Sequence, residues 1–275
     1  MSTPDDRLLA PTRWNATAIV PVLLAAFGIL YLFPGRTDDL WAWTIRPTMT
    51  AMTMGAGYLA GAWFFARVVG AGSWHRVGVG FLGTTVFTTL LLLATLLHWD
   101  RFNHDHVSFW AWMALYLATP VLLPWLWVRN RQTDPGTVDP GDTIPRTLRM
   151  AGATTGGLQL AFAAFLFVSP GAVIDHWPWA LTPLTARTLS AFVAFPAVTW
   201  LCLLFEKRWS SFEIPFETAT IGLALVALAA VRASGEFDGP RPQTWIYVGA
   251  LVTSLVWLVG LQVVLRRTRH APVDR

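Results

Sequence analysis

Eight long apolar runs are the feature of this 275-residue sequence that most limits its fold. A helix needs about 20 mostly apolar residues to cross the roughly 30 Å of hydrocarbon in a bilayer. The runs are too long for the strands of a membrane barrel and lack their alternation. We therefore predict an all-α, polytopic integral membrane bundle of about eight transmembrane helices, at residues 16–33, 48–68, 77–98, 107–128, 149–168, 185–205, 213–232 and 244–266.

The composition agrees with a membrane protein. Hydrophobic residues make up 54% of the chain and charged residues 13%, against about 25% charged residues in an average soluble protein. This excludes a disordered chain and an ordinary soluble domain. The basic residues lie in short clusters between the apolar runs and form no basic stripe, so we expect no nucleic-acid partner. The single cysteine, Cys202, cannot form an intramolecular disulfide.

The distribution of Lys and Arg predicts how the chain is oriented. Fourteen of the 20 lie in the N-terminus, the C-terminus and the loops after the second, fourth and sixth runs, and six lie in the other loops. Because cytoplasmic loops carry the excess of basic residues, we predict a multi-pass cell-membrane protein with both termini in the cytoplasm. The first run, 16–33, exceeds the roughly 7–15 apolar residues of a signal peptide, so we expect it to be retained as a span.

One loop pattern occurs twice, once in each half of the chain. Pro34–Pro47 reads PGRTDDLWAWTIRP, and Pro170–Pro183 reads PGAVIDHWPWALTP. Matched Pro, Gly, Asp and Trp residues are less easily explained by chance than matches between apolar runs. We predict a 4+4 parallel internal repeat: a first four-helix unit at 1–128, a flexible cytoplasmic linker rich in Pro and Gly at 129–147, and a second four-helix unit at 148–275.

The two matched loops supply the first candidate ligand site. Each carries a carboxylate followed by two tryptophans, a combination suited to a cation, a sugar or a lipid headgroup. The alternative is a short interfacial helix, with the Trp rings at headgroup depth and the Asp capping a helix. The candidate ligand-binding residues are Asp39, Trp41, Trp43, Asp175, Trp177 and Trp179.

Four further polar positions stand near the ends of apolar runs. Ionisable groups are costly inside a membrane, by about 2.5–3.5 kcal/mol at a helix centre, so Glu217 is a candidate for gating or proton relay. Ser210 and Glu213 have the spacing of a helix capping box. Arg187 is a candidate ligand-binding residue that could pair with Asp175, the alternative being an extended side chain that reaches the interface.

A histidine-rich loop follows the third run. Imidazole and carboxylate groups are ligands of zinc and copper, and this loop would face the outside. It contains no HExxH pattern, and a hydrated polar loop is the alternative. The candidate metal ligands are His98, Asp100, His104, His106 and His176.

Three functions are consistent with these features. The first is a carrier of a small molecule or lipid along the repeat interface, which agrees with the helix-breaking Pro120 and Pro124. The second is a non-catalytic membrane subunit or assembly partner, because no helix centre carries a charge. The third is an outward-facing metal-dependent enzyme, and only this one requires a cofactor, zinc or copper. A carrier predicts a polar cavity at the midplane between the units, and the enzyme predicts converging metal ligands. Membrane lipids are the expected partners, and a protein partner or a second copy is left open.

Overall fold

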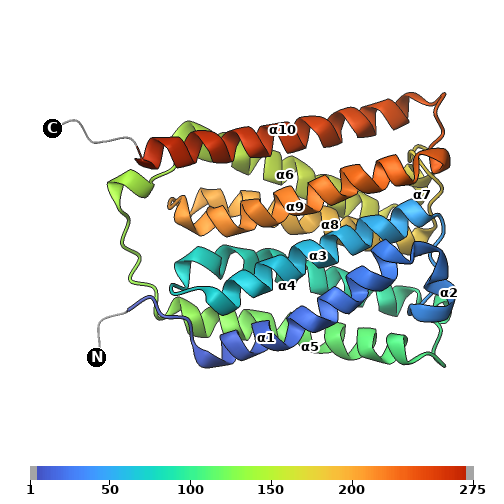
Figure 1. Cartoon of the computed structure of the whole chain (residues 1–275), viewed down its shortest axis with the longest axis horizontal. Helices are drawn as coiled ribbons and strands as arrows, with labels where there is room; N and C mark the ends of the chain where they lie inside the picture. Colours follow the sequence, from blue (N-terminus) through green and yellow to red (C-terminus); the bar gives the residue numbers. More distant parts are fainter. Residues whose placement is uncertain (1–4, 271–275) are drawn as a thin grey trace.

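The computed structural model describes residues 5–270, and all regular elements in that range are helical. Within it, eight long helices run side by side along the long axis of the molecule (Figure 1). They are α1 (Ala10–Phe27, continued by a π-helical turn at Gly28–Leu32), α3 (Thr48–Gly70), α4 (His75–Leu97), α5 (Val107–Arg131), α6 (Arg146–Val168), α8 (Pro183–Leu201, continued by a 3-10 turn at Cys202–Leu204), α9 (Ser210–Arg232) and α10 (Pro242–His270).

The bundle has two distinct ends (Figure 1). We call the end where α1 begins and α10 ends the termini face, and it carries the 3-10 turn Pro140–Asp142. The opposite end is the turn face. Its connections include the short helices α2 and α7 and three 3-10 turns, with the bounds Thr37–Leu40, Gly171–Ile174, Pro34–Arg36, Trp99–Arg101 and Ser234–Glu236.

Between residues 5 and 270, seven helices are long and apolar enough to cross a membrane, namely all the long helices except α3. The prediction of a helical, multi-pass membrane protein is therefore confirmed, whereas the count of eight spans is not. The 23 residues of α3 include Thr, Gly and Tyr, which lower its hydropathy, and most residues of the helix are buried. A helix surrounded by protein needs less apolar surface than one that faces lipid.

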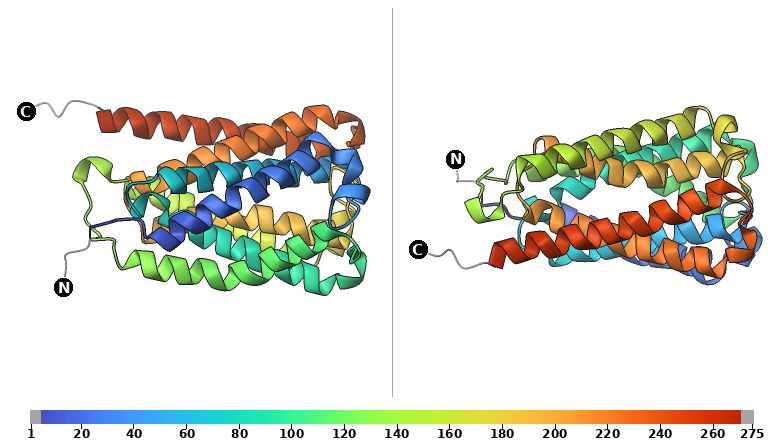
Figure 2. Two further views of the ribbon diagram at one scale, coloured as in Figure 1. Left: turned by 60° about the horizontal axis from the view of Figure 1, so that its bottom comes forward. Right: turned by 90° about the horizontal axis from the view of Figure 1, so that it is seen from above.

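The helices of the first and second halves interlock. In the first half α1 packs against α3 and α4 against α5, while in the second half α6 packs against α8 and α9 against α10. Across the halves α4 packs against α8, α9 packs against α3, and α4 contacts α9 in the centre. Figure 2 shows α10 at the edge of the bundle, where it lies mainly along α9.

Aromatic rings fill the seam between the halves. The ring of Phe87 lies 4.8 Å from that of Phe192, centroid to centroid. A Cβ atom on Gly57 would overlap the ring of Phe192, and one on Gly83 would lie 2.7 Å from the carbonyl oxygen of Phe195. Glycine is therefore required for the helices to approach this closely. At these positions the seam is filled by aromatic rings.

Candidate functional site

A cavity of about 590 Å³ opens at the turn face, between the α7–α8 connection and the α9–α10 loop. Its lining includes Asp175, Trp177 and Trp179, three of the residues that the sequence predicts to bind a ligand. The α9–α10 loop contributes charged side chains to the same lining, namely Glu236, Asp238 and Arg241. The structure therefore gathers the second of the two matched loops around an open space.

Tryptophan rings form one wall of this turn-face cavity. Trp179 is buried, its indole N–H donates to Thr50 Oγ1 at 2.8 Å, and its ring packs 5.1 Å from that of Tyr247. Trp177 meets Trp179 edge to face at 5.4 Å. The indole N–H of Trp177 is buried and has no hydrogen-bond partner among the described residues.

The charged groups of the turn-face cavity differ in how many hydrogen bonds and ion pairs they already form. Glu236 caps α3, because its carboxylate accepts from the backbone N–H groups of Thr48 and Met49 at 2.8 and 2.7 Å. Arg241 forms an ion pair with Asp238 at 2.5 Å. The carboxylate of Asp175 is exposed, and within residues 5–270 no hydrogen bond or ion pair engages it. Asp175 is thus the carboxylate with most capacity left for a ligand.

The matched loop of the first half is closed. Trp41 and Trp43 are 7% and 4% exposed, and their rings lie 5.6 and 5.0 Å from that of Trp112. Phe102 packs 5.0 Å from Trp43. Asp39 lies apart from these rings at the surface, 3.7 Å from a guanidinium nitrogen of Arg36. Asp39, Trp41 and Trp43 therefore do not join the cavity that holds Asp175.

The second tryptophan of each matched loop is packed by two rings from later segments. In the register that aligns the starts of α5 and α10, Phe102 corresponds to Phe237 and Trp112 to Tyr247. Phe237 and Tyr247 pack 5.3 and 5.1 Å from Trp179, much as Phe102 and Trp112 pack on Trp43. The aromatic packing is therefore shared by the two halves, and the open space of the second half lies beside it, between Asp175 and the α9–α10 loop.

The histidine-rich loop does not converge. His98 Nε2 accepts from Arg187 at 2.7 Å. Burial lowers the pKa of His98, and the positive charges of Arg187 and Arg101 lower it further. Arg187 also donates to the carbonyl of Phe167 at 3.0 Å, so it is engaged away from Asp175.

The remaining candidate metal ligands serve local structure or face solvent. His104 stacks 4.8 Å from Trp99, and His106 caps α5 through Ser108. Asp100 and His176 are exposed. Among the described residues, no group of three His, Cys, Asp or Glu side chains is arranged to hold a metal ion. The geometry gives the zinc or copper hypothesis no support.

Glu217 lies in an ion-pair network near the termini face. Its carboxylate pairs with Arg67 of α3 and with Arg266 of α10, the latter at 2.6 Å. Glu213 pairs with Arg76 at 3.2 Å. The network joins four helices, and a gating role for Glu217 stays a prediction. The Ser210–Glu213 capping box is wrong, because α9 begins at Ser210 itself and the Ser210 hydroxyl binds another carboxylate.

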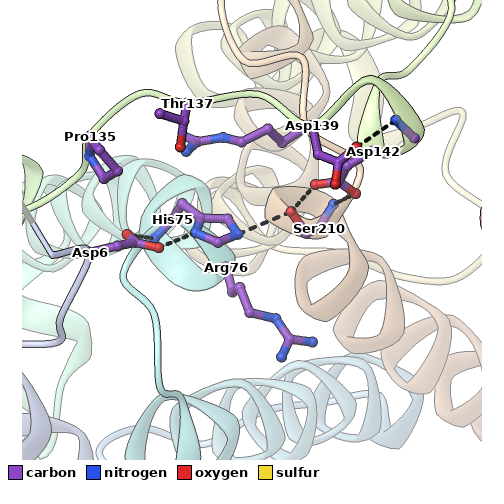
Figure 3. A pocket seen from close by; sticks show the side chains of 10 residues that line it. Asp6, His75, Arg76, Pro135, Thr137, Asp139, Asp142 and Ser210 are labelled. Atoms are coloured by element: carbon purple, nitrogen blue, oxygen red, sulfur yellow. Dashed lines mark hydrogen bonds and ion pairs between the residues drawn. The ribbon is translucent and has the colours of Figure 1, made fainter.

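The second cavity, about 690 Å³ in volume, lies at the termini face. Asp6, from the segment before α1, is fixed to the start of α4 there. Its backbone carbonyl accepts from the N–H of Trp74 at 2.7 Å, and its Oδ1 accepts from the N–H of His75 at 3.0 Å. Its Oδ2 binds His75 Nδ1 (Figure 3).

Asp142 makes the same three contacts at the start of α9. Its backbone carbonyl accepts from the N–H of Trp209 at 2.7 Å, and its Oδ1 accepts from the N–H of Ser210 at 3.0 Å. Its Oδ2 accepts from the Ser210 hydroxyl. The two arrangements meet, because His75 Nε2 lies 3.0 Å from Ser210 Oγ (Figure 3). A row of four side chains thus runs from Asp6 through His75 and Ser210 to Asp142.

The segment 132–145 is held at this face as well. Arg208 is 7% exposed and donates to Asp134 at 2.9 and 2.7 Å and to Glu206 at 3.0 and 2.7 Å. Burial raises the pKa of both carboxyls, but the hydrogen bonds from Arg208 outweigh it and hold each pKa below its usual value. These contacts anchor the expected linker, whose flexibility stays a prediction.

Sequence reasoning missed the termini-face cavity. The signal was present, because the register that aligns the two matched loops also aligns Asp6 with Asp142. Comparison with known proteins adds no name: no family model, no curated protein and no solved structure matches this chain.

Proposed function

We propose that the chain is a 4+4 parallel repeat of eight spans, with α3 as the eighth. The supporting observation is the register of the helices. One constant offset relates both ends of Ala10–Leu32 to both ends of Arg146–Val168. An offset shorter by a single position relates the starts of α3, α4 and α5 to those of α8, α9 and α10. The exchanged pairs, α4 with α8 and α9 with α3, are those expected of two units related by a two-fold axis.

The excess of basic residues at the termini face supports a cytoplasmic location for both termini, which leaves the turn face outside. Single cysteines at Asp38→Cys and Ile174→Cys, in a Cys202→Ala background, test the arrangement. An impermeant maleimide added to intact cells is expected to label both. Labelling of only one would overturn the parallel repeat, and labelling of neither would overturn the orientation.

We propose that the turn-face cavity binds an ammonium-bearing lipid headgroup. The observation that carries this is the gathering of Asp175, Trp177 and Trp179 around one cavity at the end of the apolar helices. Headgroups lie at this depth, where Trp is favoured. A carboxylate and aromatic faces attract an ammonium group, and the guanidinium of Arg241 offers a partner for a phosphate.

Native mass spectrometry of the purified protein with defined lipids tests this proposal. We expect phosphatidylethanolamine and phosphatidylcholine to bind in preference to phosphatidylglycerol, and Asp175→Asn to weaken that binding about tenfold, the equivalent of about 1.4 kcal/mol. The matched control is Asp39→Asn, which changes the exposed counterpart in the first half and is expected to bind as the native chain does. Equal binding of phosphatidylglycerol, or unchanged binding by Asp175→Asn, would overturn the proposal.

A non-catalytic subunit is the second candidate, and the filled seam favours it over a carrier. The rings of Phe87, Phe192 and Phe195 occupy the space between the halves through which a carried molecule would pass. A subunit is expected to co-purify with one partner in defined amounts. Isolation of the chain as a stable, lone protein in several mild detergents would count against this role.

A further inference from the structure

We propose that Ser210 is a nucleophile, activated by His75 and Asp6, in a site at the termini face that hydrolyses small acyl esters. This site lies at the opposite end of the bundle from the turn-face cavity. Its chemistry does not depend on headgroup binding there.

The geometry is that of a serine–histidine–carboxylate group. His75 Nε2 lies 3.0 Å from Ser210 Oγ, and His75 Nδ1 binds the carboxylate of Asp6. A carboxylate on Nδ1 fixes the proton of a neutral imidazole on that nitrogen. Nε2 is then left as the acceptor that faces the serine hydroxyl.

A purely structural role does not require this pair of side chains. At the start of α9, Ser210 satisfies Asp142 with a short hydroxyl side chain. The same position of α4 holds His75, whose ring reaches from Asp6 across to the other half of the molecule. Nδ1 of the ring binds Asp6, and Nε2 is thereby placed beside the hydroxyl of Ser210.

The hydroxyl is placed beside an open space. His75 and Ser210 both line the 690 Å³ termini-face cavity, whose other walls include Thr137 and Asp139 from the segment between the halves (Figure 3). Cavities of roughly 300–1,000 Å³ are typical of small-molecule sites. The volume is suited to a short acyl group and its alcohol.

Asp142 competes for the reacting proton. The Ser210 hydroxyl has one hydrogen, and both Asp142 Oδ2 and His75 Nε2 lie within hydrogen-bond distance of its oxygen. When Asp142 holds the hydrogen, His75 cannot accept it. An Asp142→Asn amide keeps one acceptor oxygen for the backbone N–H of Ser210, and its NH₂ donates to the serine oxygen. The hydroxyl hydrogen is then left for His75.

The reaction balances with water as the only co-reactant. Ser210 Oγ attacks the ester carbonyl carbon and forms a C–O bond, while its proton moves to His75 Nε2. The C–O bond to the alcohol breaks, and the alcohol leaves with that proton. Water then attacks the acyl carbon and gives a proton to His75, which returns it to Oγ as the acid departs.

A fluorophosphonate probe tests this proposal on the purified full-length protein. Attack by Ser210 forms a P–O bond and breaks the P–F bond, and fluoride leaves with the serine proton. We expect one adduct, located on Ser210 by peptide mass spectrometry. Absence of an adduct on Ser210 of the native, folded protein would overturn the proposal without recourse to any variant.

Variants separate activation from simple exposure. His75→Gln is expected to slow labelling by about 100-fold or more, because a general base is lost, and Asp142→Asn is expected to speed it. The matched control is Ser211→Ala, which removes the neighbouring buried hydroxyl and is expected to label as the native chain does. Gel filtration establishes that each variant is folded. Native labelling rates in a folded His75→Gln variant would overturn the role of His75.

Discussion

The contact between α6 and α8 allows a sharp test at two adjacent glycines. A Cβ atom on Gly156 would lie 2.7 Å from the carbonyl oxygen of Ala197 and 2.7 Å from Cβ of Trp200. It would also lie 2.9 Å from the backbone nitrogen of Leu201. These atoms cannot move without shifting α8. A Cβ atom on Gly157 would meet nothing within 4 Å.

The two substitutions should therefore change stability in opposite directions. Overpacking costs about 1–3 kcal/mol, whereas Ala is favoured over Gly in a helix by about 0.8–1 kcal/mol. Because the clash involves backbone atoms, we expect Gly156→Ala to lose about 1–2 kcal/mol net. Gly157→Ala should gain up to about 1 kcal/mol. Unfolding by SDS in mixed micelles, followed by circular dichroism, measures both. Equal stability of the two variants would refute this account of the α6–α8 contact.

Three further predictions concern polar contacts. Glu217→Gln should lower the free energy of unfolding by about 1–3 kcal/mol, because two guanidinium groups lose a charged partner, and thermal unfolding in detergent measures the loss. Thr182→Ala removes the capping box of α8 and should cost about 1 kcal/mol, while Thr182→Ser should restore most of it. The pKa values of Asp134 and Glu206 are lowered by folding, so their stabilisation is present above the unfolded values near pH 4 and is lost as the pH falls through the lower folded values. Hydrogen exchange of segment 132–145 should rise on acidification, and Arg208→Gln should remove most of that pH dependence; an unchanged profile in Arg208→Gln would contradict the role of this arginine.

Much of the fold could be predicted because lipid imposes simple rules on sequence. A span must be long, apolar and helical, so the apolar runs located the long helices to within several residues. One missed helix start has a local cause. α1 begins at Ala10 rather than at residue 16, since Pro11 lies in its first turn, where a missing N–H costs nothing. Lipid rules identify spans but do not determine which helices face one another.

The sites were less predictable because they depend on contacts between distant segments. The repeated motif singled out Asp175 and Trp177, yet the rings that pack on the first motif, Phe102 and Trp112, come from another part of the chain. The bond between His75 and Ser210 joins residues from different halves of the molecule. Sequence periodicity does not predict contacts between side chains of distant segments. Pro and Gly content likewise does not show whether a segment is flexible or anchored by other residues.

The exchanged packing of α4 with α8 and of α9 with α3 has a consequence for biogenesis. When the ribosome has released only the first four long helices into the bilayer, the flanks of α3 and α4 still lack their permanent neighbours. Those neighbours are synthesised only with the second half. Until then the flanks of α3 and α4 are in contact with lipid or with a chaperone. The bundle therefore assembles cooperatively, after the second half has been inserted. A fragment ending at residue 131 should be degraded unless the remainder is co-expressed.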